Sequence, residues 1–358
     1  MPLFMDVHKG SEFTLEEVKK AHLADLEVQA KYGVRYVQYW VNDTAGMVFC
    51  LMEGPNKEAC ESVHQEAHGG VACNIIQVEK GDYELLMGVT TVDEHDLTHN
   101  QLGEMDYGYR IFVSVSFAGH VSRLIEPEFM AGKVLRELGG REIIHPGPEI
   151  IGVFNCCQQA INYAQTVHCM VTEFLEQEEL GEKVEFRISV AAGEPVTEND
   201  GLFGDTIQFV RRLNTLAGRN RILLSSLVKD LYSGSTISTK PREELFKVLT
   251  PADEKLLARL MEVAESRLND QQFTVSSLSR EIGISRPQLY RKILHLTEIS
   301  PNDLIRELRL SKAERLVRRK DQNISEIALE VGFSNPSYFS KCFYDRFGIL
   351  PSQYLVTA

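Results

Sequence analysis

The strongest constraint on the fold of this 358-residue chain is a structural plan that occurs twice near its C-terminus. In FTVSSLSREIGISRPQLYRKILHL, Ser276 or Ser277 is placed to cap a short helix that ends at Gly283, and Ser285 is placed to cap a second helix. NISEIALEVGFSNPSYFSKCF repeats this plan, with a glycine at the turn and Asn335 as the cap. A glycine-containing turn between two short helices has helix-turn-helix spacing, so we predict two such units.

The segment between the two units, PNDLIRELRLSKAERLVRRK, is predicted to form one long helix that holds them apart. Its apolar residues recur at the three- and four-residue spacing of a helix with one buried face. They are Leu304, Ile305, Leu308, Leu310, Ala313, Leu316 and Val317. We therefore expect residues 251–358 to form an all-α domain.

This C-terminal segment resembles the DNA-binding domain of the arabinose-regulator (AraC) family of transcription factors. The resemblance implies that the second helix of each unit enters the major groove of double-stranded DNA. Arg, Gln and Asn offer paired hydrogen-bonding groups to base edges, and a lysine suits a phosphate. The residues assigned to DNA contact are Arg286, Gln288, Tyr290 and Arg291 in the first unit, and Asn335, Ser337, Tyr338 and Lys341 in the second. The alternative is a helical bundle with no nucleic-acid partner.

Charge is distributed unevenly along the chain. The formal net charge is −13, but from Lys255 onward there are 16 Lys and Arg against 12 Asp and Glu, a net charge of +4. The preceding residues therefore carry −17. A basic module beside an acidic body is typical of a protein in which one part meets phosphates, although chance asymmetry gives the same division.

The N-terminal region, residues 1–88, alternates strands and helices. We predict a strand in MPLFMDVHKG, a helix with a Thr14–Glu17 capping box in TLEEVKKAHLADLEVQAKYG, and a hairpin in VRYVQYWVND and GMVFCLMEGP. A second helix follows and ends at Gly69 and Gly70, and CNIIQVEK is the last strand. This order of elements predicts a ferredoxin-like α+β domain.

His64 and His68 lie four residues apart on that second helix. Residues at this spacing face the same way, so both imidazoles could reach one metal ion. Other imidazole and carboxylate groups on the first strand and the first helix are Asp6, His8, His22 and Asp25. The alternative is that the two histidines are solvated or capping groups of an ordinary helix.

The phrases FMDVHKG, AHLADL, VFCLMEGP and VHQEAHGG resemble a small ferredoxin-like family whose characterised members bind nickel. The resemblance assigns four metal ligands, which are His8, His22, His64 and His68. Imidazole-rich sites suit nickel, zinc, copper or cobalt on chemistry alone, so nickel rests on the resemblance. Cys50 and Cys60 are expected to be buried apolar residues. His95 and His99 are a second candidate pair.

The middle of the chain begins after an acidic segment, residues 89–107, which we predict to be a linker. Residues 108–250 then alternate strands and helices in an α+β pattern. EFRISVAAGEPVTENDGLFGDTIQFVRRLNTLAG resembles the class III adenylate and guanylate cyclase domain. The cyclase pattern G-D-T-x-N-x-x-x-R-L is matched by Gly204, Asp205, Thr206, Arg212 and Leu213.

The cyclase resemblance fails where such enzymes hold two magnesium ions with aspartates. The chain has FAG at 117–119 and GPE at 147–149, and Gln208 replaces the asparagine. Only Glu149 could substitute for a ligand. We therefore predict no catalytic residues and no enzyme activity. The domain is expected either to pair two chains, as cyclase folds do, or to sense a nucleotide, and an active cyclase fused to a DNA-binding domain is the remaining alternative.

Bulk properties complete the prediction. No apolar run approaches the roughly 18 residues of a membrane helix, and MPLFMDVHKGSEF has no signal-peptide pattern. Seven cysteines without C-x-x-C spacing suit reduced thiols. We expect a cytoplasmic transcription regulator, a homodimer, whose DNA affinity is controlled by nickel or a related divalent metal. Alternatively, an organic or nucleotide ligand in the cyclase-like domain controls it and the histidines are structural.

Overall fold

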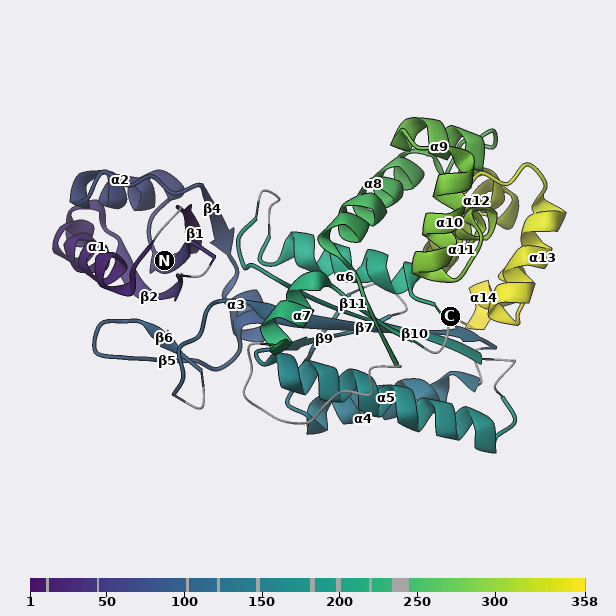
Figure 1. Ribbon diagram of the computed structural model, residues 1–358, viewed down its shortest axis with the longest axis horizontal. Coiled ribbons are helices and arrows are strands. Elements are labelled where there is room, and N and C mark those ends of the chain that lie inside the picture. Colours follow the sequence, from purple (N-terminus) through teal and green to yellow (C-terminus); the bar gives the residue numbers. More distant parts are fainter. Residues whose placement is uncertain are drawn as a thin grey trace. The chain divides into compact units, whose positions relative to one another are not determined.

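The computed structural model describes residues 1–10, 13–43, 45–100, 103–120, 123–145, 149–180, 184–197, 201–218, 221–233 and 245–357 (Figure 1). The chain forms two compact units. The first comprises Met1–Ile111 with Ala192–Gln208, and the second comprises Phe112–Ala191 with Phe209–Ala358. Within the described ranges, no helix is long and apolar enough to cross a lipid bilayer.

The first unit is built on a four-stranded antiparallel sheet with strand order β2-β3-β1-β4. Its elements are β1 (Leu3–Lys9), α1 (Leu15–Val28), β2 (Arg35–Asn42), β3 (Met47–Glu53), α2 (Lys57–Ala67) and β4 (Asn74–Val78). Residues of both helices and all four strands share one apolar core. This element order, with β1 and β3 in the centre, confirms the ferredoxin-like prediction.

Local sequence signals determine where the two helices begin and end. Thr14 and Glu17 form the predicted capping box of α1. The Asn56 side chain accepts a backbone N–H in the first turn of α2. His68 is the C-cap of α2, and Gly69 follows with a φ of +72°. The two histidines of ESVHQEAHGG therefore lie in the last turn of a helix and at its cap.

The segment predicted to be an acidic linker, residues 89–107, is folded. Its elements and the helix before it are α3 (Lys80–Met87), β5 (Thr91–Val92) and β6 (Thr98–His99). The Thr98 hydroxyl donates to the carbonyl of Tyr39 in β2 at 2.8 Å, and Thr98 is fully buried. Leu97, Thr98 and Asp106 of this segment are buried, whereas Asp93, Glu94 and Glu104 are exposed, so the segment that we expected to be a linker packs against β2.

The middle of the chain forms a six-stranded sheet with order β12-β11-β10-β7-β9-β8. Its elements are β7 (Arg110–Gly119), α4 (Ile125–Glu137), β8 (Arg141–Ile143), β9 (Ile150–Phe154), α5 (Cys157–Gln177), β10 (Val184–Gly193), α6 (Gly204–Leu216), β11 (Ile222–Leu224), α7 (Ser226–Ser233) and β12 (Phe246–Val248). Strands β10, β11 and β12 are parallel, whereas β8 and β9 are antiparallel. Helices α4 and α5 lie together on one face of the sheet (Figure 1). The α+β prediction is confirmed.

The C-terminal part is entirely helical where it is described. Its helices are α8 (Pro251–Arg267), α9 (Val275–Ile282), α10 (Arg286–Thr297), α11 (Pro301–Arg319), α12 (Ile324–Glu330), α13 (Pro336–Phe347) and α14 (Pro351–Thr357). Ser285 and Asn335 cap α10 and α13 as predicted. The first cap differs from the prediction: Thr274 caps α9, because its hydroxyl accepts the N–H of Ser277. The two helix-turn-helix units are confirmed as α9–α10 and α12–α13.

The long helix α11 lies between the two helix-turn-helix units in sequence, as predicted. Its C-terminal half shares one apolar cluster with α12, α13 and α14. The α11 members of that cluster are Leu310, Ala313, Leu316 and Val317. The second helix-turn-helix unit is therefore packed on α11 through these residues.

Candidate metal site and nucleic-acid interface

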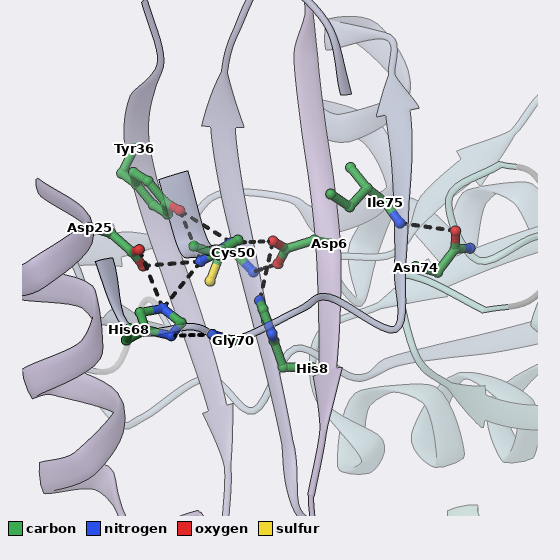
Figure 2. Close-up of polar contacts among 10 residues, drawn as sticks. Asp6, His8, Asp25, Tyr36, Cys50, His68, Gly70, Asn74 and Ile75 are labelled. Carbon is green, nitrogen blue, oxygen red and sulfur yellow. Dashed lines mark hydrogen bonds and ion pairs between the residues drawn. The ribbon is translucent and has the colours of Figure 1, made fainter. Parts of the chain in front are cut away.

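His64 lies between two buried carboxylates in the first unit, those of Asp6 and Asp25, which are labelled in Figure 2. Its Nε2 donates to Oδ2 of Asp6 on β1 at 2.7 Å, and its Nδ1 lies 3.2 Å from Oδ2 of Asp25 on α1. None of these three side chains is more than 3% exposed. The Tyr36 hydroxyl is 3.2 Å from both ring nitrogens. Four elements, β1, α1, β2 and α2, thus contribute polar groups to one buried cluster.

His8 and Cys50 extend the cluster on the side of Asp6. The β1–β3 register sets Asp6 opposite Cys50, whose N–H donates to Asp6 Oδ1 at 3.0 Å. His8, two residues along β1, places its Nε2 3.3 Å from Asp6 Oδ2. The candidate ligand atoms of Asp6, His8, Cys50 and His64 all lie within 4.8 Å of one another.

His68 extends the cluster on the side of Asp25. Its Nε2 lies 3.3 Å from Asp25 Oδ1 and 3.4 Å from His64 Nδ1. The N–H of Gly70 donates to His68 Nδ1 at 3.1 Å, which leaves Nε2 directed at the cluster (Figure 2). Asp25, His64 and His68 form a second group of ligand atoms within 4.8 Å, so His64 belongs to both groups.

His22 is the predicted ligand that lies outside both groups. Its Nε2 is 3.1 Å from the Asp96 carboxylate, and its ring packs against Tyr39 with the centroids 4.5 Å apart. Its Nδ1 is buried and has no hydrogen-bond partner in the described part of the chain. The structure therefore brings His8, His64 and His68 together and holds His22 beside them through Asp96.

A cavity of about 430 Å³ opens onto the cluster. Its wall includes His8, His22, Asp25, His64 and His68, together with apolar side chains of α1 and β3. Side-chain exposure rises from 2% at His64 to 26% at His68. An ion therefore has a path from solvent past His68 to the buried carboxylates, as a metal site requires.

The positive charge of the cluster resides on His64. Burial lowers the pKa of His64, but its contacts with Asp25 and Asp6 outweigh burial and raise this pKa to about 10. Burial likewise opposes ionisation of Asp6, yet His8 and His64 hold the pKa of Asp6 well below its usual range. At neutral pH an imidazolium therefore sits between two carboxylates. A divalent cation would take the place of that proton, because metals bind neutral imidazole.

The residues of the cluster fit a divalent metal ion. Two donor atoms that each lie about 2.1 Å from an ion are about 3 Å apart when they are adjacent around it. Contacts between neighbouring donors here run from 2.7 Å to 3.4 Å, and all donors of each group lie within 4.8 Å of one another. Among the described residues, His8 Nε2 and Asp25 Oδ1 are buried without a hydrogen-bond partner, and such atoms are rare in native proteins. Nitrogen and carboxylate donors suit nickel, copper, zinc or cobalt.

Sequence spacing alone does not identify the whole cluster. It pairs Asp6 with His8 and Asp25 with His22, but it does not reveal that the two carboxylates meet across His64. Cys50 and Cys60 are buried members of the apolar core, as predicted, and the strand register in addition sets Cys50 opposite Asp6. The available signal was the Asp-x-His pattern on one strand and a cysteine on its partner strand.

The second candidate pair of histidines is not brought together. His95 Nε2 lies 3.4 Å from the Glu94 carboxylate, and His99 Nδ1 lies 3.0 Å from the carbonyl of Leu97 in its own hairpin. In the described ranges, neither histidine belongs to a group with metal-ligand spacing.

The eight side chains predicted to contact DNA are all exposed on or beside α10 and α13, namely Arg286, Gln288, Tyr290, Arg291, Asn335, Ser337, Tyr338 and Lys341. Two of them also cap their helices. Gln288 Oε1 accepts the N–H of Ser285 at 3.2 Å, and Asn335 Oδ1 accepts the N–H groups of Ser337 and Tyr338 at 2.8 and 3.1 Å. These two amide oxygens are therefore engaged, and only their NH2 groups remain to donate to a base.

In the middle region, polar groups that the cyclase resemblance singles out are engaged in ion pairs. Arg212 on α6 donates to Glu265 on α8 at 2.6 Å. Glu149 accepts from Arg211 at 2.5 Å. Neither side chain is free to bind a nucleotide or a magnesium ion without breaking these contacts.

Of the two positions where cyclases carry aspartates, the structure describes the first fully and the second only in part. At the end of β7, Phe117 and Ala118 are buried apolar residues. Gly147 and Pro148 lie outside the described residues.

Comparison with known families identifies two parts of the chain. Residues 4–78 match the family model of the nickel responsive protein SCO4226-like, and residues 278–356 match that of a helix-turn-helix domain. The C-terminal segment is an AraC-type helix-turn-helix domain. The N-terminal segment is a SCO4226-like domain. Both resemblances seen in the sequence are confirmed.

Individual relatives match only parts of the chain. Histidine kinase P4 of Formosa agariphila is 42% identical over 106 residues, which are 30% of this chain and 8% of that kinase. The HTH-type transcriptional regulator CdhR of Pseudomonas aeruginosa is 36% identical over 88 residues, which are 24% of this chain and 26% of that regulator. The chain thus spans well under two thirds of the length of either relative.

Two solved structures are also similar. SCO4226 of Streptomyces coelicolor A3(2) is 40% identical, covers 21% of this chain and 94% of its own, and gives a TM-score of 0.21. An adenylate/guanylate cyclase/hydrolase of Silicibacter pomeroyi is 20% identical, covers 36% of this chain and 83% of its own, and gives a TM-score of 0.29. Each likeness is confined to part of the chain.

Proposed function

We propose that the chain is a cytoplasmic transcription regulator that binds DNA through its AraC-type domain and responds to a divalent metal ion held in its SCO4226-like domain. The observation that carries the proposal is the buried His64 between Asp6 and Asp25, with His8 and His68 each 3.3 Å from one of these carboxylates. The family match of residues 4–78 favours nickel among the metals that such donors bind.

The proposed ligands are the three histidines of the cluster and the carboxylates that they contact, with the Cys50 thiol as a further donor. A bound ion would join side chains of β1, α1 and α2, which are separate elements of the first unit. His22 would line the cavity, with its ring held in place by Asp96, and would not bind the ion. The ion would therefore stiffen the SCO4226-like domain.

We propose that the middle region is not an active cyclase. The engagement of Arg212 with Glu265 and of Glu149 with Arg211 supports this proposal, as does the apolar end of β7. The curated relative CdhR is a transcriptional regulator. Incubation with nucleoside triphosphate and magnesium or manganese should release no cyclic nucleotide.

Metal control of DNA binding requires linkage between the two sites. A metal ion alters DNA affinity only if it binds the DNA-competent state with a different affinity from the other state. The simplest such difference is in how two copies of the chain pair, and we propose a homodimer. The same coupling factor must then appear when DNA is added to the protein before metal.

Metal titration tests the first half of the proposal. Tag-free protein is stripped of metal, and nickel, zinc, copper and cobalt are titrated into the wild type and into His64→Ala, His64→Gln and His95→Ala. We expect stoichiometric binding that both His64 variants lose and that His95→Ala keeps, because His95 lies outside the cluster. The fluorescence of Trp40 reports that each variant is folded, since Trp40 is fully buried in the same unit. Equal binding by all four proteins would refute the assigned site.

DNA selection tests the second half. A random-sequence duplex pool is selected with the full chain, and the affinity for the selected sequence is measured at fixed salt with and without nickel. We expect an affinity difference that His64→Gln abolishes. Equal affinities would exclude metal control while leaving DNA binding intact.

A further inference from the structure

A second cavity, of about 440 Å³, lies in the second unit and plays no part in the proposed metal response. This volume is within the range of small-molecule sites. The lining residues that matter are Glu128, Phe129, Gly132 and Arg136 on α4, Glu142 on β8 and Arg318 on α11. The cavity thus borders both the middle sheet and the long helix of the AraC-type domain.

Some charged groups of this cavity are engaged and some are not. Arg318 donates to Glu314 at 3.2 Å and to the Tyr354 hydroxyl at 2.7 Å. By contrast, the side chains of Glu128 and Arg136 form no hydrogen bond or ion pair within the described part of the chain, although Arg318 is near enough to act on the Glu128 carboxyl. Both an anionic and a cationic group are therefore available to a ligand.

The helix α4 presents these two groups on one face. Glu128, Gly132 and Arg136 are spaced by four residues, so they follow one another along the side that lines the cavity. Arg136 Nη1 lies 3.6 Å from the place where a Cβ on Gly132 would be. The guanidinium therefore folds back along the helix toward Gly132, the residue midway between Arg136 and Glu128.

The cavity wall carries apolar as well as charged side chains. Phe129 and Ile144 line the cavity and are 59% and 95% exposed, so they offer apolar surface to a ligand. Burial raises the pKa of Glu128 more than the nearby Arg318 lowers it, and within the described residues no hydrogen-bonded or ion-paired partner stabilises the charged form of its side chain. A cation in the cavity would supply that partner.

We propose that this cavity binds a small zwitterion, an amino acid with an apolar side chain, with its ammonium at Glu128 and its carboxylate at Arg136. The apolar side chain would pack on Phe129 and Ile144. Arg318 belongs to α11, so the bound molecule would contact the helix that carries the second helix-turn-helix unit. The cavity is thus a second effector site, independent of the metal cluster.

Isothermal titration of the full-length, metal-stripped chain tests this site. The probes are leucine, isoleucine, valine, methionine and phenylalanine, each at up to about 10 mM. Two analogues of leucine separate the charges: 4-methylpentanoate lacks the ammonium, and 3-methylbutylamine lacks the carboxylate. The variants are Glu128→Gln and Arg136→Gln. The control is Lys133→Gln, because Lys133 is on the same helix but pairs with Glu137 outside the cavity.

We expect at least one amino acid to bind, roughly tenfold or more tightly than either analogue. Each cavity variant should weaken binding by a similar factor, and Lys133→Gln should leave it unchanged. Far-UV circular dichroism confirms that the variants are folded. The proposal is overturned if no probe binds, if 4-methylpentanoate binds as tightly as leucine, or if the cavity variants bind like wild type. None of these outcomes bears on the metal proposal, whose readout is metal binding in the other unit.

Discussion

Glu307→Gln should destabilise the second unit by several kcal/mol. Glu307, on α11, accepts from Arg187 on β10 and from Arg346 on α13 through the same oxygen, each at 2.9 Å. The exposures of the three side chains are 14%, 8% and 13%, so the substitution leaves two largely buried guanidinium groups with only the more distant Glu185, 3.7 Å from Arg346, as a counter-charge. Breaking such a buried pair costs about 3–5 kcal/mol.

Urea unfolding measures this loss with an internal reference. With an m-value of roughly 3 kcal/mol/M, the midpoint followed by circular dichroism at 222 nm should fall by about 1–1.7 M. The one tryptophan, Trp40, lies in the first unit, so its fluorescence transition should stay in place. Glu265→Gln is the matched control: the Arg212–Glu265 pair is more exposed, at 23% and 43%, and its loss should cost at most about 1 kcal/mol.

The pH dependence of the same effect has a definite sign. Burial opposes ionisation of Glu307, but Arg346 and Arg187 outweigh burial and lower its pKa in the folded protein. A carboxyl with a depressed folded pKa stabilises the protein above its unfolded pKa, about 4.3, and that contribution is lost as the pH falls further. The difference between wild type and Glu307→Gln should be full at pH 7 and shrink in acid below about pH 4. A difference below about 1 kcal/mol at pH 7, or an equal shift of the Trp40 transition, would refute the reasoning.

Three further predictions concern the AraC-type domain. Gly332→Ala should lower the free energy of unfolding by more than about 2 kcal/mol, because φ is +85° and a Cβ would lie 2.1 Å from the Leu268 carbonyl oxygen. Gly283→Ala is the control, because φ is +81° there but the space around the residue is open, and it should lower that free energy by only about 1 kcal/mol. Equal losses in chemical denaturation would contradict this account. Asn335→Ala should lower the free energy of unfolding by about 1 kcal/mol, because the helix loses its N-cap. Asn335→Asp should retain the cap but weaken binding to the selected DNA. An Asp variant that binds DNA like the wild type would exclude a DNA contact at this position. Lys341→Ala should reduce the slope of log affinity against log salt by about 1 on any duplex, and an unchanged slope would remove Lys341 from the phosphate contacts.

The sequence by itself determined the features that depend on residues close together in the chain. Ser285 and Asn335 cap their helices as predicted, because a cap is a contact between a side chain and a backbone N–H two or three residues later. The ferredoxin-like order of the N-terminal elements followed from hydrophobic patterns of the same local kind. The shift of the first cap to Thr274 shows the limit, since two neighbouring hydroxyl side chains offered the same local chemistry.

Only the tertiary structure decided which distant groups meet. Asp6, Asp25 and His64 come from three elements, and their contacts depend on strand register and helix packing, which spacing along the chain does not encode. His22 has the same residue type and the same kind of neighbour as the other histidines. It nevertheless pairs with Asp96, because the segment expected to be an open linker folds back onto β2 and brings that carboxylate to it. Ligand distances of about 3 Å are set by packing, and packing is a property of the whole fold.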